Sequence, residues 1–364
     1  MNFDLDEQQE LLADSLSRLF DAHVANYPDD YDRIWGDYRD MGLLGLPFAE
    51  AHGGLAGRPE DMMILMEAYG RTLARAPYLQ SVLLAGQLLA RVEGAYAAEL
   101  LSSLVTGARR FTLCLTEPGS RYRWDAPSTR AVAVDNGWTI SGEKSAVLDT
   151  QAETWLICPA MTDDGLGMFV IPPGAPGLTL ETRSTPDGRT ASDIRMDDVR
   201  LDATAALGDP AGNHAILLEV TDRAIAAICS EAVGAMERLL ELTVDYLATR
   251  QQFGVAIGSF QALQHRAADM MMEVEQARSI TIHAVSMLDM PARERSVAVS
   301  SAKALINRAA RFVGQQAIQL HGGMGLTSEY SAGGYFQRLT VLEALLGDSD
   351  HHLAVIERIG NPAA

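Results

Sequence analysis

Between about residues 111 and 208 the spacing of apolar residues changes, and this change restricts the chain to a fold with separate helical and β regions. Before it, apolar residues recur every three or four positions, as at Leu12, Leu16 and Leu19, which predicts helices that pack by one face. Within it, short alternating runs such as residues 131–134 are separated by turns rich in Gly, Pro and Asn, which is typical of a small antiparallel sheet or barrel. Helical spacing then returns. The sequence predicts an α+β fold that is mostly α.

This pattern predicts three domains, which are an N-terminal helical domain (residues 1–110), a central antiparallel β-domain (111–208) and a C-terminal helical-bundle domain (209–364). A chain of 364 residues is also long for one hydrophobic core. In the last domain we expect a four-helix bundle. The spacing predicts long helices at about 214–250, 260–288 and 293–320, and then two shorter helices separated at Gly347.

The composition of the chain narrows the classes of partner. The formal net charge of −19 argues against nucleic acid or an anionic membrane surface, and an anionic substrate would need a local basic pocket. No apolar run reaches the roughly 18 residues of a membrane-spanning helix, and the acidic start, residues 1–7, does not resemble a signal peptide. Cys114, Cys158 and Cys229 are isolated and lack CxxC spacing, so we expect free thiols and no metal site. These features predict a cytoplasmic protein.

Five motifs occur in a fixed order along the chain. They are Met41–Pro47 with His52–Leu55, Leu115–Gly119 (Leu-Thr-Glu-Pro-Gly), Ser141–Lys144, Arg250–Gly254 with Phe260 and Gln261, and Gln319–Gly325. Their order and spacing resemble those of the acyl-CoA dehydrogenase family over essentially the whole chain. The resemblance implies that family's fold, with a helical domain, a β-domain and a four-helix bundle. It also implies FAD as the cofactor and an acyl-CoA as the substrate.

A closer resemblance is to the small (β) subunits of two-subunit acyl-CoA dehydrogenases, such as pimeloyl-CoA dehydrogenase. It is carried by Asp245–Arg250, Gln261–Met270, Tyr335–Thr340 and Gly347–Leu353. This resemblance implies an oligomer with a large acyl-CoA dehydrogenase subunit as partner. It also implies that electron-transfer flavoprotein, or a similar acceptor, takes the electrons.

In this family each flavin lies across a subunit interface. One subunit covers the isoalloxazine ring, and its neighbour reaches over to the pyrophosphate and adenine. The resemblance implies that this chain keeps the reaching half, because a cationic fork suits phosphate and glycines let the backbone approach it. The residues concerned are Arg250, Phe253, Gln261, Gln319, Gly322 and Gly323. The alternative is that Arg250 is a surface cation and the Gly-Gly pair only ends a helix.

The covering half departs from the family pattern. Thr116 is retained and could bond the flavin ring, but Ala146 stands at the position of a shielding tryptophan and Leu148 at that of a hydroxyl residue. Leu346 replaces the glutamate that acts as the family's base, and Asp348 follows where a threonine is expected. The usual catalytic residue is therefore absent from this position.

Other candidates for a base are weak. Some family members carry the base on the first long helix of the C-terminal domain, and that position corresponds to Ala224. Asp222 lies two residues away, half a helical turn off in direction; it could serve as a displaced base, but as a solvated helix residue it needs no further explanation. Asp348 is expected to cap the helix that follows it. Adjacent histidines such as His351 and His352 point apart and make a poor metal site, while Glu343 is expected to face solvent.

Three hypotheses follow for the function. The first is a non-catalytic small subunit that completes the FAD site of a catalytic partner in the α,β-dehydrogenation of an acyl-CoA. The second is a self-sufficient acyl-CoA dehydrogenase with a displaced base, such as Asp222. The third is an assembly module without a flavin contact. Retention of the reaching half favours the first over the third, and the absence of a glutamate at both usual positions favours it over the second.

Overall fold

The computed structural model describes residues 5–26, 29–327 and 330–361. Residues 1–4, on which part of the signal-peptide argument depends, lie outside this range. The described chain forms two compact units. The helical unit contains Met1–Asp29, Arg58–Ala74 and Ile225–Ala364, and the sheet unit contains Asp30–Gly57 and Arg75–Ala224. Among the described residues, no helix combines the length and apolar character needed to cross a membrane.

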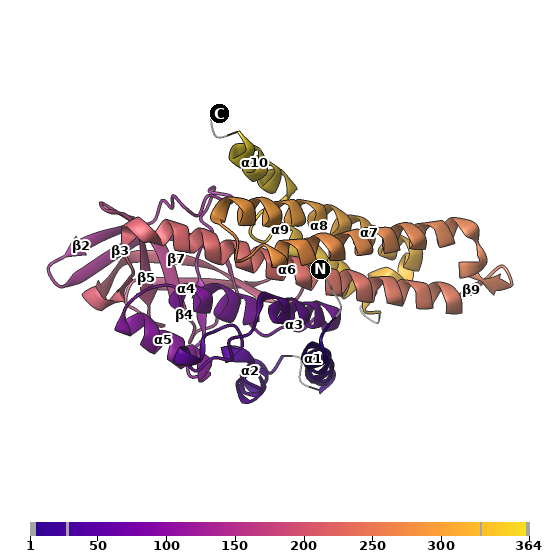
Figure 1. The fold of residues 1–364 in the computed structure, drawn as a ribbon, viewed down its shortest axis with the longest axis horizontal. Helices are drawn as coiled ribbons and strands as arrows, with labels where there is room; N and C mark the ends of the chain where they lie inside the picture. Colours follow the sequence, from indigo (N-terminus) through magenta and orange to yellow (C-terminus); the bar gives the residue numbers. More distant parts are fainter. Residues whose placement is uncertain (1–4, 27–28, 328–329, 362–364) are drawn as a thin grey trace. The chain divides into compact units, whose positions relative to one another are not determined.

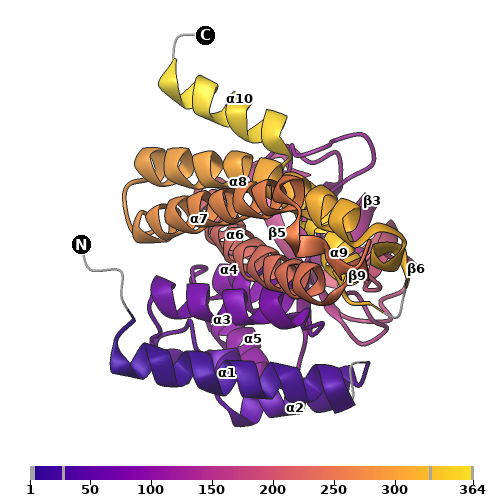
Figure 2. The same ribbon diagram turned by 90° about the vertical axis from the view of Figure 1, so that its right-hand side faces the viewer.

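Long helices build the helical unit. They are α1 (Glu7–Asn26), α3 (Pro59–Thr72), α6 (Pro210–Thr249, whose first turns belong to the sheet unit), α7 (Gln261–Ser286), α8 (Ala292–His321), α9 (Ala332–Ala344) and α10 (Ser349–Gly360). Helices α7 and α8 run side by side (Figures 1 and 2). Between α6 and α7 lie β9 (Gln251–Gln252), β10 (Val255–Ala256) and the 3₁₀ turn η5 (Ile257–Ser259), and η6 (Gly322–Leu326) follows α8. The predicted long helices and the break at Gly347 are confirmed.

Two glycines allow α3 and α6 to approach each other closely. A Cβ added to Gly70 would lie 1.9 Å from the carbonyl oxygen of Glu231, and one added to Gly234 would lie 2.0 Å from that of Glu67. Because both obstacles are backbone atoms, no side-chain rearrangement could relieve either clash. The position of α3 against α6 therefore depends on this reciprocal contact.

The sheet unit combines shorter helices with one sheet. Its helical pieces are α2 (Tyr31–Asp40), η1 (Leu43–Gly45), η2 (Glu50–His52), the π-helical η3 (Leu79–Gly86), α4 (Gln87–Leu89), α5 (Ala95–Val105) and η4 (Ala203–Ala205). Its strands are β1 (Phe111–Leu113), β2 (Arg130–Val134), β3 (Gly137–Leu148), β4 (Trp155–Thr162), β5 (Gly165–Ile171), β6 (Leu178–Ser184), β7 (Thr190–Asp202) and β8 (Ala206–Leu207). The strand order is β6-β7-β3-β2-β4-β5-β8, with β1 paired to β4.

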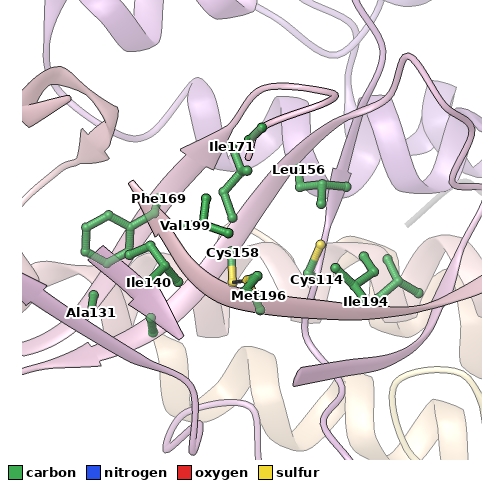
Figure 3. Packing of buried hydrophobic residues seen from close by; sticks show 13 residues of the cluster. Cys114, Ala131, Ile140, Leu156, Cys158, Phe169, Ile171, Ile194, Met196 and Val199 are labelled. Carbon is green, nitrogen blue, oxygen red and sulfur yellow. Dashed lines mark hydrogen bonds between the residues drawn. The ribbon is translucent and has the colours of Figure 1, made fainter. Parts of the chain in front are cut away.

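Most strand pairs are antiparallel, as the alternating pattern predicts, but β4 pairs in parallel with β1 and with β2. Alternate residues of the strands meet in an apolar core that Figure 3 shows from close by. There Cys158 lies beside Met196, with the two sulfur atoms 3.6 Å apart. Cys114, Cys158 and Cys229 are all buried free thiols, in agreement with the sequence. The predicted α+β fold class is confirmed.

Candidate functional site

A buried ion pair joins the two motifs of the sheet unit that were expected to cover a flavin. Lys144 Nζ lies 2.7 Å from Glu117 Oε1, and both side chains are completely buried. Glu117 also accepts hydrogen bonds from the hydroxyls of Ser128 and Thr129, both at 2.6 Å, and Lys144 donates to the carbonyl of Pro159 at 2.8 Å. Burial by itself raises the pKa of Glu117, but the hydrogen bonds from Lys144, Ser128 and Thr129 and the lysine charge bring it down to about 2. We call Glu117 and Lys144 the buried frame.

Next to this frame lie the positions that were expected to belong to a flavin cradle. The backbone N–H of Ser145 donates to the carbonyl of Thr116 at 2.8 Å, so the two motifs are aligned. Thr116 is half-buried and keeps its hydroxyl. Ala146 is exposed, has a left-handed φ of 51° and donates its N–H to Asp193. Leu148 is buried, with 8% of its surface exposed. The backbone frame is therefore present, while positions 146 and 148 lack an aromatic ring and a hydroxyl group.

In the helical unit, a short hairpin follows α6, and we call residues 250–261 the cofactor arm. Strands β9 and β10 pair antiparallel, and their two-residue turn places Phe253 and Gly254 at positive φ. Phe253 is 91% exposed, and its ring packs edge-on against that of Phe260 at 6.2 Å. Arg250 and Gln261 are exposed, and Arg250 makes no ion pair with any other described residue. The arm thus presents an arginine, a phenylalanine and a glutamine to its surroundings.

The Gly-Gly turn lies at the C-terminal end of α8, and Gln319 occupies the last turn of that helix. Gln319, Gly322 and Gly323 are all exposed. Gly322 has φ 57° and ψ −138°, a conformation that essentially requires glycine. A Cβ at Gly322 or Gly323 would meet no atom within 4 Å. The backbone of the turn is therefore open to a ligand atom. The donors that the arm and the turn offer (a guanidinium, side-chain amides and backbone N–H groups) are of kinds that suit a pyrophosphate.

The loop between α9 and α10 carries Leu346, the residue that was expected at the position of the family's glutamate, and buried polar side chains hold this region. Lys303 on α8 donates to the carbonyls of Leu342 and Glu343 at 2.8 and 3.1 Å, and to Asn307 at 2.6 Å. His352 Nε2 lies 3.0 Å from the carbonyl oxygen of Leu346. Burial lowers the pKa of Lys303 to about 8. The loop is therefore held by hydrogen bonds near both of its ends, and its one carboxylate, Asp348, caps α10.

The second histidine of the pair, His352, is buried and has a polar atom close to each ring nitrogen. Its ring is 1% exposed and lies between Leu346 and Ser300, whose hydroxyl is 3.2 Å from Nδ1. Burial, with smaller contributions from the positive charges of Lys303 and His351, lowers its pKa to about 3. Asp348 accepts a hydrogen bond from the backbone N–H of His351 at 2.8 Å, which confirms the predicted N-cap.

Two expectations about acidic side chains are wrong. Glu343 was expected to face solvent, but it is 17% exposed and pairs with Arg311. Asp222 was expected to be a solvated helix residue, but it is only 4% exposed, because the side of α6 that carries it is buried. Neither residue was found in its expected setting, and the proposed catalytic role of Asp222 stays a prediction.

Several residues of the site escaped sequence reasoning. The ion pair of the buried frame joins two motifs that were recognised separately. Lys303 lies on the apolar side of α8, at helical spacing from the buried Val299 and Ile306, and a lysine at that spacing is a signal that could have been used.

Among the described residues, no group of three or more His, Cys, Asp or Glu side chains is arranged to hold a metal ion.

Comparison with known proteins agrees with this arrangement along the whole chain. Residues 6–108, 112–202 and 216–360 match the N-terminal, middle and C-terminal domains of acyl-CoA dehydrogenases. The chain is 28% identical to the probable acyl-CoA dehydrogenase YngJ of Bacillus subtilis, over 98% of this chain and 99% of that protein.

Solved structures show the same likeness. The Tcur3481–Tcur3483 steroid ACAD is 29% identical, with a TM-score of 0.87 and 98% of each chain covered. The ChsE4–ChsE5 complex from Mycobacterium tuberculosis is 25% identical, with a TM-score of 0.87 and 100% of each chain covered. The chain is therefore a member of the acyl-CoA dehydrogenase family, whose members are FAD-dependent oxidoreductases.

Proposed function

We propose that this chain is the non-catalytic small subunit of a two-subunit acyl-CoA dehydrogenase, and that it completes the FAD site of a catalytic large subunit. The observation that carries the proposal is an asymmetry within the chain. The cofactor arm and the Gly-Gly turn expose the groups that suit a pyrophosphate, whereas the base position holds Leu346 and the ring-cradle positions hold Ala146 and Leu148. Loss confined to one half of a shared site is expected of subunits with different tasks.

The missing carboxylate weighs heavily against independent catalysis. In the dehydrogenation of an acyl-CoA thioester, a base removes a weakly acidic α-proton while bound FAD supplies the acceptor for the β-hydride. General-base catalysis contributes roughly 10²- to 10⁴-fold in rate, and a leucine side chain cannot provide it. Asn307 and His352 hold the loop through the carbonyls of Gly347 and Leu346, and the leucine side chain offers no proton acceptor there.

In the proposed complex, the residues of this chain bind and orient the partner's cofactor. Arg250 would contact the pyrophosphate with its planar fork of donors, and the open backbone of Gly322 and Gly323 would approach the same group. Gln261 and Gln319 would donate amide hydrogen bonds, and the ring of Phe253 would pack on the cofactor. None of these groups removes or delivers a proton in the reaction.

The exposed apolar residues at this end of the helical unit support an assembly. Phe253, Phe260, Met271 and Met272 are 91%, 40%, 57% and 56% exposed, and such side chains commonly mark surfaces that another chain covers. The names of the two similar structures above describe pairs of gene products, which also supports a heteromer. Electrons would leave the partner's flavin for electron-transfer flavoprotein or a similar acceptor.

The proposal is tested first on the isolated chain. We expect the purified protein to hold far less than one FAD per protomer after addition of excess FAD and gel filtration, and not to reduce a dye acceptor with saturated acyl-CoAs of different chain lengths. One bound FAD per protomer together with acyl-CoA oxidation would show that the chain is a self-sufficient enzyme. A base would then have to be sought, beginning with Asp222.

The second test concerns the partner. Tagged chain purified from its own cells should bring down an acyl-CoA dehydrogenase that carries glutamate where this chain has Leu346. The two chains, mixed in equal amounts, should bind FAD and oxidise an acyl-CoA. A partner that is fully loaded and fully active without this chain would contradict the proposal.

A further inference from the structure

Three aromatic rings pack against one another where α6 and α8 end, and they join the two segments expected to contact the cofactor; Tyr246 and Tyr330 also touch each other edge-on, with ring centroids 5.8 Å apart. We call these three rings the aromatic cluster. The ring centroid of His321 lies 4.7 Å from that of Tyr246 and 4.9 Å from that of Tyr330. Tyr246 belongs to the last turn of α6, and its carbonyl accepts the backbone N–H of Arg250 at 2.9 Å. His321 is the last residue of α8 and directly precedes Gly322. The aromatic cluster therefore connects the start of the cofactor arm with the Gly-Gly turn.

The imidazole of His321 is held in place within this cluster. His321 is 2% exposed, and its Nδ1 lies 2.8 Å from the carbonyl oxygen of Ala317. Since a carbonyl only accepts, the proton is assigned to Nδ1. Burial lowers the pKa of His321, against the raising effect of the carbonyls of Ala317 and Leu242. Among the described residues Nε2 makes no hydrogen bond of standard geometry, although the carbonyl of Leu242 lies near the ring.

The ring nitrogens and the aromatic surface of His321 contribute differently. A buried nitrogen without a hydrogen bond of good geometry adds nothing to stability, so Nε2 does not explain why a histidine stands here. The ring supplies an aromatic surface that packs against both tyrosines. The hydroxyl of Tyr330 also donates to the carbonyl of Leu242 on α6 at 3.3 Å, so Tyr330 is itself fastened to the helix that carries Tyr246.

We infer that His321 is a positioning residue for the cofactor contact. Its ring, packed against both Tyr246 and Tyr330, fixes the spacing between Arg250 and the Gly322–Gly323 backbone, so that both can meet one pyrophosphate. This inference rests on the proposed function. A bidentate contact needs its groups within about 0.5 Å of the productive geometry, and Arg250 follows one helical turn after Tyr246. Loss of the His321 ring from the aromatic cluster therefore weakens the contact made by Arg250.

The experiment is a double-mutant cycle in the complex with the catalytic partner. The variants of this chain are Arg250→Ala, His321→Leu and the two combined, and His321→Phe is the conservative control because it keeps a flat ring. The dissociation constant of FAD is measured by titrating the FAD-depleted complex and following flavin fluorescence. Thermal unfolding of the FAD-depleted complex is recorded in parallel.

We expect Arg250→Ala to weaken FAD binding about 10-fold or more in the wild-type background, but about 3-fold or less in the His321→Leu background, since coupled residues are not additive. His321→Phe should stay within about 3-fold of wild type. A purely structural role of His321 would lower the unfolding temperature and leave the Arg250 effect unchanged, which would overturn the inference.

Two further outcomes are informative. If Arg250→Ala has no effect in the wild-type background, the proposed function itself fails, and the inference fails with it. If the His321→Leu complex does not assemble, Tyr330→Leu is used in its place, because it removes another ring of the aromatic cluster. It should reduce the effect of Arg250→Ala on the dissociation constant of FAD in the same way. An undiminished Arg250 effect in that variant overturns the inference.

Discussion

At the scale of single residues, the buried frame shows that a charged group can be essential to a site without taking part in chemistry. Lys144 and Glu117 have no contact with solvent, yet together they accept or donate hydrogen bonds to five other groups. Removing two charges from water is costly, and only close pairing with further hydrogen bonds offsets that cost. The frame therefore aligns Thr116 with Ser145 but tolerates no loss of one partner.

The first prediction concerns this pair. Lys144→Met should destabilise the protein by about 3–5 kcal/mol, because it leaves the carboxylate of Glu117 buried and unpaired. Urea unfolding followed by circular dichroism measures the effect. The control is Arg183→Met, since Arg183 pairs with Glu181 at the surface (69% and 71% exposed) and such a pair contributes about 0–1 kcal/mol. Equal losses in the two variants would contradict the burial argument.

The second prediction uses the lowered pKa of His352. As pH falls below about 6.5, the unfolded chain binds a proton that the folded chain does not bind until about pH 3. Stability from this group is therefore present above the unfolded pKa and is lost as pH falls towards 3, by about 2 kcal/mol between pH 7 and 5. His352→Gln should flatten the profile of urea midpoint against pH. The exposed His283→Gln is the control, and an equal flattening there would refute the assignment.

At the scale of secondary-structure elements, the close crossing of α3 and α6 determines how helices pack within the helical unit. Gly70 and Gly234 face the backbone of the opposite helix at distances that no Cβ could occupy. Arg338 on α9 then pairs with Glu231 on α6, at 2.7 Å and with both side chains buried, so α9 is attached to the same part of α6. The loop that carries Leu346 begins where α9 ends, and its place depends on this chain of helix contacts.

The third prediction tests the crossing. Gly234→Ala should lower stability although alanine favours a helix over glycine by about 1 kcal/mol, because the helices must separate to admit a methyl group. Gly212→Ala in the same helix is the matched control, since a Cβ there meets nothing within 4 Å, and it should be neutral or stabilising. Thermal unfolding compares the two. A stabilised Gly234→Ala variant would show that α3 and α6 are not in close contact.

At the scale of the whole molecule, catalysis by this family needs a base, a flavin cradle and a bound cofactor together. At the positions expected to hold the base and to form the cradle, the backbone of this chain is hydrogen-bonded, but the side chains there are those of Leu346, Ala146 and Leu148. Restoring one group should therefore not restore the function.

The fourth prediction follows from this. Leu346→Glu in the isolated chain should not give measurable oxidation of acyl-CoAs, even with excess FAD, because positions 146 and 148 still lack the aromatic ring and hydroxyl expected of the cradle. Dye reduction with acyl-CoAs of several chain lengths is the measurement, and Leu345→Glu is the control for a nonspecific effect of the added charge. Turnover by Leu346→Glu alone would mean that the cradle is functional and that only the base was missing.

The sequence by itself determined the fold class, the helix and strand regions and the family, because periodicity and turn residues are local and the motifs occur in a recognisable order. It also predicted the N-cap at Asp348 and the free cysteines. Only the tertiary structure decided the environment of single polar groups. Glu343 and Asp222 were expected in solvent, but burial depends on which helix face meets a neighbour, and helical spacing does not specify that for every position.

The same reason explains why the supports of the candidate site were not foreseen. Each of these supports joins residues from separate segments of the chain. They are the Glu117–Lys144 pair, the contacts of Lys303 with the end of α9 and of His352 with Leu346, and the aromatic cluster of Tyr246, His321 and Tyr330. Their energies come from exclusion of water and from close packing, and both arise only when the segments meet in the folded chain.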